Sequence, residues 1–277
     1  MSIRTDLYAI RLGPAAPGDL MKTVSVCSIS DTGIRPANED AYLVSRLTCP
    51  LGDYSLLAVA DGLGGHPAGE VASHLAVRTL EKILREQLQS LTDPGIDSLR
   101  SLLSLAFSET NRTIADLAET QPEWYGMATT LVAALVAEDD LCVIGNVGDS
   151  RAYLISDSLE RITRDHSRVQ ELVDCGVLSP EEAEHHPQKN IVTRIVGRRG
   201  DAPDIFTCRL GSSILLLCTD GLLDGLSERK ILSVTREAEF PDLCRELVRE
   251  AKEASRDNIT VVAAKWPGET GPSPGDR

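Results

Sequence analysis

The chain alternates short hydrophobic runs with longer stretches in which hydrophobic residues return every three or four positions. The short runs are typical of strands, and Ile214–Cys218 has the length and bulk of a strand covered on both faces. Brief polar breaks such as 138–140 separate neighbouring runs, and connections this short can join only antiparallel strands. Strands are therefore expected at 23–30, 41–47, 54–60, 129–137, 140–147, 151–156, 205–209, 213–218 and 259–265.

Helical spacing is present at 69–88, 97–120 and 241–254, and it predicts three helices. Because the strands group in hairpins and the helices form separate blocks, the pattern favours α+β layers over a parallel sheet of alternating units. Pro and Gly break any periodicity at both ends of the chain. We therefore expect one domain at 22–266, between an N-terminal extension at 1–21 and a flexible tail at 267–277.

Two of the hydrophobic runs stop abruptly at an Asp-Gly pair, at Asp61 and at Asp220. The glycine lets the backbone turn sharply and approach a ligand closely, so each carboxylate would stand at the mouth of a buried strand. Further acidic residues lie at strand ends near Asp40 and Asp257. Because these acids are far apart in the sequence, only the folding of the chain can bring them together. A set of oxygen ligands without His or Cys suits Mg²⁺ or Mn²⁺. A two-metal hydrolase is the first hypothesis.

Charge and composition narrow the classes of partner. A net charge of -14 and a pI near 4.8 disfavour binding along a nucleic-acid backbone or docking on an anionic membrane. No run reaches the roughly 18 apolar residues of a spanning helix, and the start lacks the apolar core of a secretory signal, which favours a cytoplasmic location. Cys27, Cys142 and Cys218 lie within hydrophobic runs and are expected to be buried thiols.

Seven segments, taken in order, cover nearly the whole expected domain with recognisable motifs. They are SDTGIRPANEDAYL (30–43), AVADGLGGHPAGEVAS (58–73), MATTLVAALV (127–136), GNVGDSRAYL (145–154), ITRDHSRVQELVDCGVLSPEEAEHHPQKNIVTRIVG (162–197), LLLCTDGLLDGLS (215–227) and SRDNITVV (255–262). In these motifs the chain resembles the PPM family of metal-dependent protein serine/threonine phosphatases, the PP2C-like group, in its compact bacterial form. The resemblance implies a four-layer α/β/β/α sandwich of two antiparallel sheets flanked by helices, with metals at one end.

The same resemblance implies a set of metal ligands for Mn²⁺ or Mg²⁺. They are Asp61 with the backbone carbonyl of Gly62, Asp220, Asp257, Glu39 or Asp40, and Asp149. Asp61 would bridge two ions, and Asp149 would share a third, weaker ion with Asp220. The alternative for Asp61, Asp149 and Asp257 is a turn or capping role, because Asp side chains satisfy local backbone donors.

Arg35 matches the position that grips the substrate phosphate, and a guanidinium fork fits two phosphate oxygens. Its alternative is a surface arginine paired with an acid. His66 is the candidate for proton transfer, or it orders its loop or meets the substrate. Residues 165–197 correspond to the variable flap at the mouth of the site, where substrate choice is expected, with a solvated helical face as the alternative. His166, at the start of this flap, is interpreted as structural.

We therefore expect a cytoplasmic, monomeric phosphatase that hydrolyses phosphoserine and phosphothreonine on proteins by attack of metal-activated water. It would oppose a Ser/Thr kinase in bacterial signalling. One alternative is a catalytically silent module that binds phosphoproteins, which the intact Asp61, Asp220, Asp257 and Arg35 argue against. Another is the dedicated phosphatase of a single regulatory partner, such as an anti-sigma-factor antagonist, whose chemistry would be the same.

Overall fold

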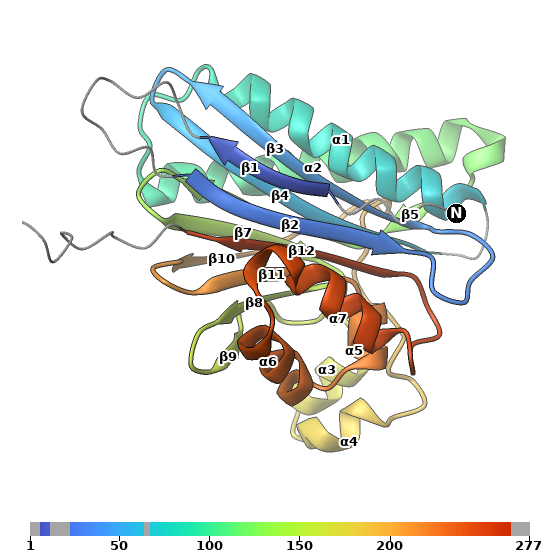
Figure 1. The fold of residues 1–277 in the computed structure, drawn as a ribbon. Helices are drawn as coiled ribbons and strands as arrows, with labels where there is room; N and C mark the ends of the chain where they lie inside the picture. The colour runs from blue at the N-terminus through green and yellow to red at the C-terminus, as the bar shows by residue number, and fades with distance from the viewer. Residues whose placement is uncertain (1–5, 12–22, 64–66, 267–277) are drawn as a thin grey trace, which may run out of the picture.

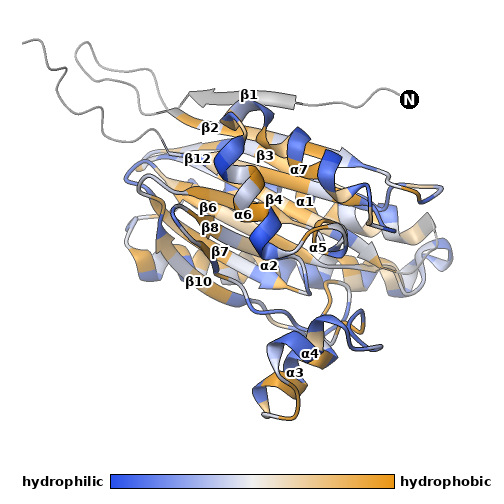
Figure 2. Cartoon of the chain, turned by 60° about the horizontal axis from the view of Figure 1, so that its bottom comes forward, coloured by the Kyte–Doolittle hydropathy of each residue, from blue (hydrophilic) through white to orange (hydrophobic). Residues whose placement is uncertain are grey.

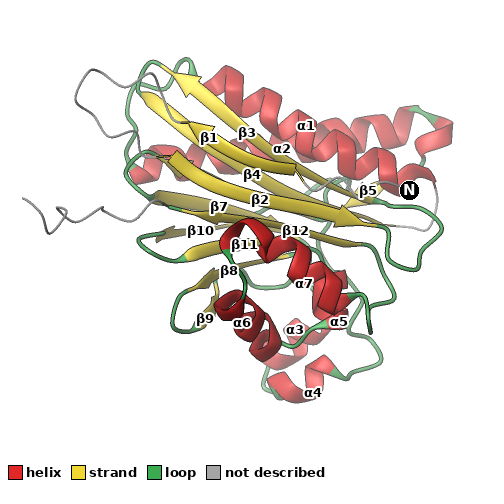
Figure 3. Cartoon of the chain, viewed as in Figure 1, coloured by secondary structure: helices red, strands yellow, loops and turns green. Residues whose placement is uncertain are grey.

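Two antiparallel sheets pack face to face, and helices cover the outer face of each (Figure 1). The structure is a computed structural model that describes residues 6–11, 23–63 and 67–266. Figure 3 shows the two yellow sheets between red helices. This arrangement confirms the predicted α+β sandwich of four layers.

The first sheet has the strand order β1-β2-β12-β11-β8-β9. Its strands are β1 (Asp6–Arg11), β2 (Thr23–Asp31), β8 (Arg151–Ile155), β9 (Leu159–Arg161), β11 (Ile214–Cys218) and β12 (Ile259–Lys265). In the register of this sheet, Val261 lies opposite both Ile29 and Cys218. The ends of β2 and β11 therefore lie beside the start of β12, so the loops that follow Asp31 and Cys218 share one edge with the loop that precedes Ile259.

The second sheet has the order β10-β7-β6-β4-β3, with the short β5 paired to the end of β4. Its strands are β3 (Asp40–Cys49), β4 (Gly52–Leu63), β5 (Ala128–Thr129), β6 (Leu131–Ala137), β7 (Leu141–Val147) and β10 (Asp204–Arg209). Asp40 at the start of β3 lies opposite Asp61 near the end of β4. Val147 at the end of β7 pairs with Leu131 at the start of β6. These positions bring two acidic strand ends together with the turn that follows Val147.

Helices α1 (Pro67–Leu88) and α2 (Ile96–Thr120) cover the second sheet, and α5 (Asp220–Gly225), α6 (Glu228–Glu237) and α7 (Leu243–Ala251) cover the first. The short helices α3 (Arg168–Asp174) and α4 (Pro180–Glu184) belong to the segment expected as a flap. Figure 2 shows them projecting from the body of the sandwich. Two 3₁₀ turns, Pro122–Trp124 and Phe240–Asp242, complete the described helical elements.

The core forms three hydrophobic layers. Val59 and Leu217 lie in the layer between the sheets. Phe107 of α2 belongs to the layer between the second sheet and its helices, and Leu247 of α7 belongs to the layer between the first sheet and its helices. Burying one such side chain contributes about 1.5–3 kcal/mol relative to leaving it exposed. The hydrophobic faces of the strands therefore account for both the stacking of the sheets and the attachment of the helices. Cys27, Cys142 and Cys218 are buried within these layers, as predicted.

All of the predicted strands and all three predicted helices are present, with bounds that differ by a few residues, and the strand predicted at 129–137 is divided into β5 and β6. Strands β1 and β9 and helices α3 to α6 were not predicted. β1 lies within the extension expected at 1–21 and pairs along its length with β2, while the tail expected at 267–277 lies outside the described residues. In the described part of the chain, no helix combines the length and the hydrophobicity needed to cross a membrane.

Candidate metal centre

The acidic strand ends of both sheets meet at one pocket of about 510 Å³. Of the residues expected in the site, the pocket is lined by Arg35, Glu39, Asp61, Gly62, Asp149, Asp220 and Asp257. Asp40 lies behind this wall, opposite Asp61 in the β3–β4 register and 4% exposed. His66, the candidate for proton transfer, lies outside the described residues.

The backbone of Asp61 is fixed by two threonines from the β5–β6 segment. Its carbonyl accepts hydrogen bonds from Thr129 Oγ1 at 2.7 Å and from the Thr130 amide at 2.8 Å, and its amide donates to Thr130 Oγ1 at 3.0 Å. A side chain at Gly62 would place Cβ 2.3 Å from the Gly69 carbonyl oxygen, so only glycine fits there. The carboxylate of Asp61 therefore starts from an immobile backbone, because three hydrogen bonds and a close approach hold it.

Thr219 links Asp40 to the first sheet. Thr219 Oγ1 donates to Asp40 Oδ2 at 2.9 Å and accepts from the Thr260 amide at 3.0 Å. The other oxygen, Asp40 Oδ1, is buried and has no hydrogen-bond partner among the described residues, and the same holds for Asp220 Oδ1. A buried acceptor without a partner is costly, so each oxygen is suited to a cation.

Asn258 holds together the loop that carries Glu39. Its Oδ1 accepts from the Glu39 amide at 2.8 Å, and its Nδ2 donates to the carbonyls of Thr32 and Ala37, each at 2.9 Å. The Glu39 carbonyl in turn accepts from the Gly62 amide at 3.2 Å. Asn258 was not predicted as a site residue, although it directly follows Asp257 in the last matched segment.

Arg35 and Asp257 form an ion pair at the edge of the pocket. Arg35 Nη2 donates to Asp257 Oδ2 at 2.6 Å, and Arg35 Nε donates to the Arg256 carbonyl at 3.1 Å. About half of the Arg35 side chain, 52%, remains exposed. Arg35 is therefore paired with an acid at the surface, as its alternative interpretation held. It also lines the pocket, as the phosphate-binding hypothesis requires.

Burial and, after it, the crowding of like charges raise the pKa values of the carboxyls at the pocket. Burial, reinforced by neighbouring carboxylates, raises the pKa of Asp40 to about 7 and that of Asp220 to about 6. The pKa values of Asp61 and Asp149 are raised well above their ordinary range for the same two reasons, burial first. Among the described residues, no three side chains of His, Cys, Asp or Glu converge closely enough to form a ready-made metal site. The unpartnered oxygens and the crowded carboxylates nevertheless fit divalent cations, because cations would relieve both costs.

Comparison with known proteins places this pocket in a family. The family model described as protein phosphatase 2C matches residues 36–260, which is most of the chain. The chain belongs to the protein phosphatase 2C family. This phosphatase is 38% identical over 214 residues to the serine/threonine phosphatase stp of Listeria innocua serovar 6a, covering 75% of the chain and 82% of that protein.

Solved structures agree with this assignment. The serine/threonine phosphatase Stp1 from Staphylococcus aureus superposes on the phosphatase with a TM-score of 0.79 at 36% identity, covering 88% of this chain and 95% of that one. The catalytic domain of the serine threonine protein phosphatase PstP, in complex with two manganese ions, superposes with a TM-score of 0.73 at 34% identity. That match covers 88% of this chain and 98% of the PstP chain.

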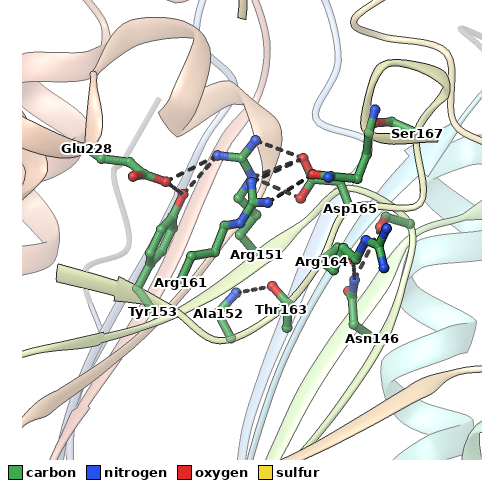
Figure 4. A network of polar contacts seen from close by, with 12 residues as sticks. Asn146, Arg151, Ala152, Tyr153, Arg161, Thr163, Arg164, Asp165, Ser167 and Glu228 are labelled. Carbon is green, nitrogen blue, oxygen red and sulfur yellow. Dashed lines mark hydrogen bonds and ion pairs between the residues drawn. The ribbon is translucent and has the colours of Figure 1, made fainter. Parts of the chain in front are cut away.

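A second pocket of about 590 Å³ adjoins the carboxylate pocket, between helices α3–α4 and helices α5–α6. The two pockets share Asp149, Asn190 and Asp220 as lining residues, and Asn190 was not selected from the sequence. Arg151 lies at this second pocket and donates to Asp165 through Nε and Nη2, at 2.7–3.1 Å (Figure 4). This partly buried ion pair ties the start of the flap to β8.

Proposed function

We propose that this phosphatase hydrolyses phosphoserine and phosphothreonine on proteins at a centre of two divalent metal ions. The observation that carries the proposal is the meeting of acids from both sheets with one arginine at a single pocket. The relatives named serine/threonine phosphatases, at 38–39% identity, support the substrate class. The pocket itself supports the metal class, because its ligand atoms are carboxylate oxygens.

The ligands that we propose are Asp61 with the carbonyl of Gly62, Asp220, Asp257, Glu39 or Asp40, and, for a third ion, Asp149. Bound Mn²⁺ or Mg²⁺ would supply neutralising charge for the phosphoryl oxygens and would lower the pKa of water for attack on phosphorus. The chain contributes a rigid arrangement. Thr130 fixes the Asp61 backbone, and Thr219 orients Asp40, so the carboxylates need little reorganisation when the charge of the substrate arrives.

Arg35 is the proposed phosphate-binding residue. Its Nε and one Nη2 hydrogen are used by Arg256 and Asp257, which leaves Nη1 and the second Nη2 hydrogen for phosphate oxygens. The ion pair with Asp257 also links the substrate site to a proposed metal ligand. A phosphate bound by Arg35 would therefore lie at the edge of the carboxylate pocket. His66 remains the prediction for proton transfer to the leaving serine or threonine oxygen.

Phosphorylated proteins are the expected substrates, and a cognate Ser/Thr kinase is the expected opposing enzyme. A dedicated role toward one regulatory partner would use the same site. Profiling of phosphopeptides derived from several kinase substrates separates the two, since a dedicated enzyme would accept one family of peptides only.

Phosphate release from a phosphothreonine peptide in the presence of Mn²⁺ tests the proposal. We expect turnover that EDTA abolishes and that Asp61→Asn and Asp220→Asn reduce by at least about a thousandfold, because these substitutions remove charge from the proposed ligands while keeping the side-chain shape. Asp97→Asn, an exposed acid at the start of α2, is the matched control and should retain wild-type turnover.

Two results would count against this function. Turnover that survives both ligand substitutions and EDTA would refute the metal mechanism. A folded wild type that binds the phosphopeptide yet releases no phosphate with either Mn²⁺ or Mg²⁺ would favour the silent binding module.

A further inference from the structure

His166 contacts the turn that carries Asp149. It lies between β9 and α3, and its side chain is 4% exposed. The Gly148 amide donates to His166 Nδ1 at 3.2 Å, and the His166 amide donates to the Gly148 carbonyl at 2.9 Å. Both polar backbone groups of Gly148 are therefore bonded to one residue, 18 positions further along the chain.

The hydrogen bond from Gly148 fixes the protonation state of the His166 ring. A backbone amide can only donate, so Nδ1 must be the unprotonated nitrogen and Nε2 must carry the hydrogen. Nε2 lies 3.1 Å from Asp204 Oδ2, which accepts that hydrogen. Arg194 Nη1 lies 3.2 Å from Nε2 and, because Nε2 carries a hydrogen, directs its own donation to Asp204 Oδ1 at 2.9 Å. Burial lowers the pKa of His166, in keeping with a neutral ring.

His166 also joins the two ends of the flap. Its carbonyl accepts from the Thr193 amide at 2.7 Å, and Ser167 forms an isolated β-bridge with Val192. Asn146 Nδ2 donates to the carbonyl of Gly148 at 3.2 Å and to that of Arg164 at 3.2 Å, and Figure 4 shows Asn146 beside Arg164. The same turn is therefore bonded to the chain just before the flap. The Asp149 turn and the base of the flap are therefore parts of one hydrogen-bonded unit centred on His166.

The turn has little freedom of its own. Gly148 has φ +109°, and a Cβ there would lie 2.6 Å from the Thr130 side chain. Thr130 also holds Asp61, through Oγ1. A shift of Gly148 away from His166 would therefore move Asp149 relative to Asp61, since the two are linked by this packing.

We infer that His166 is a positioning residue for Asp149, and that its neutral imidazole holds the Gly148–Asp149 turn where Asp149 can bind a divalent cation. The inference rests on the metal-binding role proposed for Asp149. His166 touches neither substrate nor metal in this role and acts only through Gly148. Outer-shell partners of this kind typically change metal affinity by 10–100-fold when they are removed.

Two amide substitutions separate the two ring contacts. The amide of His166→Asn reaches the place of Nδ1 and can keep an acceptor for Gly148, whereas that of His166→Gln reaches the place of Nε2 and keeps only the contact with Asp204. We expect Mn²⁺ titration by calorimetry to show about tenfold weaker binding at the lowest-affinity step for His166→Gln, and wild-type binding within about threefold for His166→Asn. Hydrogen exchange of metal-free protein should show faster exchange at the Gly148 amide in His166→Gln only.

His74→Asn, at an exposed histidine of α1, is the control for the loss of an imidazole and should match wild type in both measurements. Asp149→Ala tests the premise separately. If Asp149→Ala binds Mn²⁺ as wild type does, the metal role of Asp149 is wrong and the inference is overturned with it. If Asp149→Ala loses a binding step while His166→Gln binds normally or keeps Gly148 protected, the inference alone is overturned. Equal losses in His166→Gln and His166→Asn would also overturn it, because they would indicate a general packing role.

Discussion

Replacing Asp40 with asparagine should stabilise the metal-free protein at neutral pH. The buried carboxyl of Asp40 has a pKa of about 7 in the fold, against an ordinary value of 3.8, because burial and the charges of Asp220 and Asp257 disfavour ionisation. Above that pKa the folded protein must hold a buried, crowded negative charge that the unfolded chain exposes to water. Asparagine has the same shape and carries no charge.

The size of the effect follows from the displaced pKa. A carboxyl whose pKa rises from 3.8 to about 7 on folding costs about 4 kcal/mol once it is ionised in both states. The asparagine oxygen can still accept from Thr219 Oγ1, but its NH₂ would replace Oδ1, which has no partner among the described residues. An unpaired buried amide costs about 1–3 kcal/mol, so we expect a net stabilisation of about 2 kcal/mol.

Urea unfolding in EDTA at about pH 8 and about pH 5 measures this difference and its sign. Between the unfolded and folded pKa values of Asp40 the folded state binds more protons, so wild-type stability falls as pH rises from about 4 to about 7. The advantage of Asp40→Asn should therefore be fully present at about pH 8 and reduced by more than half at about pH 5.

Added Mn²⁺ should make the wild type more stable than Asp40→Asn. Bound cations stabilise the wild type by mass action, and they neutralise the Asp40 charge, which asparagine does not have. Asp53→Asn offers a contrast, since this buried acid is paired with Arg46 and should lose stability at neutral pH. A metal-free Asp40→Asn that is less stable than wild type at about pH 8 would refute the charge argument. An advantage that does not change with pH would do the same.

Three further substitutions test the support of the site. In steady-state kinetics, Arg35→Ala should raise the KM for a phosphothreonine peptide by at least about tenfold. Arg35→Lys should give an intermediate KM, since lysine keeps the charge but lacks the guanidinium fork. Asn258→Ala removes three hydrogen bonds that hold the Glu39 loop and should cost about 3 kcal/mol in urea unfolding; a loss below about 1 kcal/mol would contradict this structural role. Gly221→Ala would place Cβ 1.9 Å from the Asn258 carbonyl oxygen and should lower both the unfolding free energy, by about 1–3 kcal/mol, and Mn²⁺ affinity measured by calorimetry.

The strands of the two sheets could be predicted because each is a short continuous hydrophobic run, whereas the helices show hydrophobic residues only at every third or fourth position. Leu56, Val132 and Leu217 are all completely buried, so the sequence pattern reflects the packing directly. Some of the elements that were missed lack this signal. β9 has only three residues, none of them buried, and α5 begins at Asp220 within a run interpreted as a strand end and turn. Short elements such as these depend on tertiary contacts, which no local pattern reveals.

The candidate site divides in a similar way. Acids that end a hydrophobic run, such as Asp61 and Asp220, are visible in sequence because the Asp-Gly turn accompanies them. Thr219, Asn258 and His166 have no such mark, since each bonds to a group far along the chain. These groups are the Asp40 carboxylate, the Glu39 amide and the Gly148 amide, respectively. Their partners are fixed only when the two sheets pack, so sequence alone could not assign them.

This division predicts opposite effects for the two kinds of residue in the metal-free protein. The carboxylates are held close by uncharged side chains. Thr130 and Asn258 bond to the backbone of Asp61 and Glu39, Thr219 bonds to the Asp40 carboxylate, and these favourable hydrogen bonds offset the repulsion that the carboxylates create. Neutralising a carboxylate should therefore stabilise the metal-free fold while it weakens cation binding. Removing one of the uncharged supports should weaken both. Stability and metal affinity measured on the same variants would then separate ligands from supports, without any reference to catalytic activity.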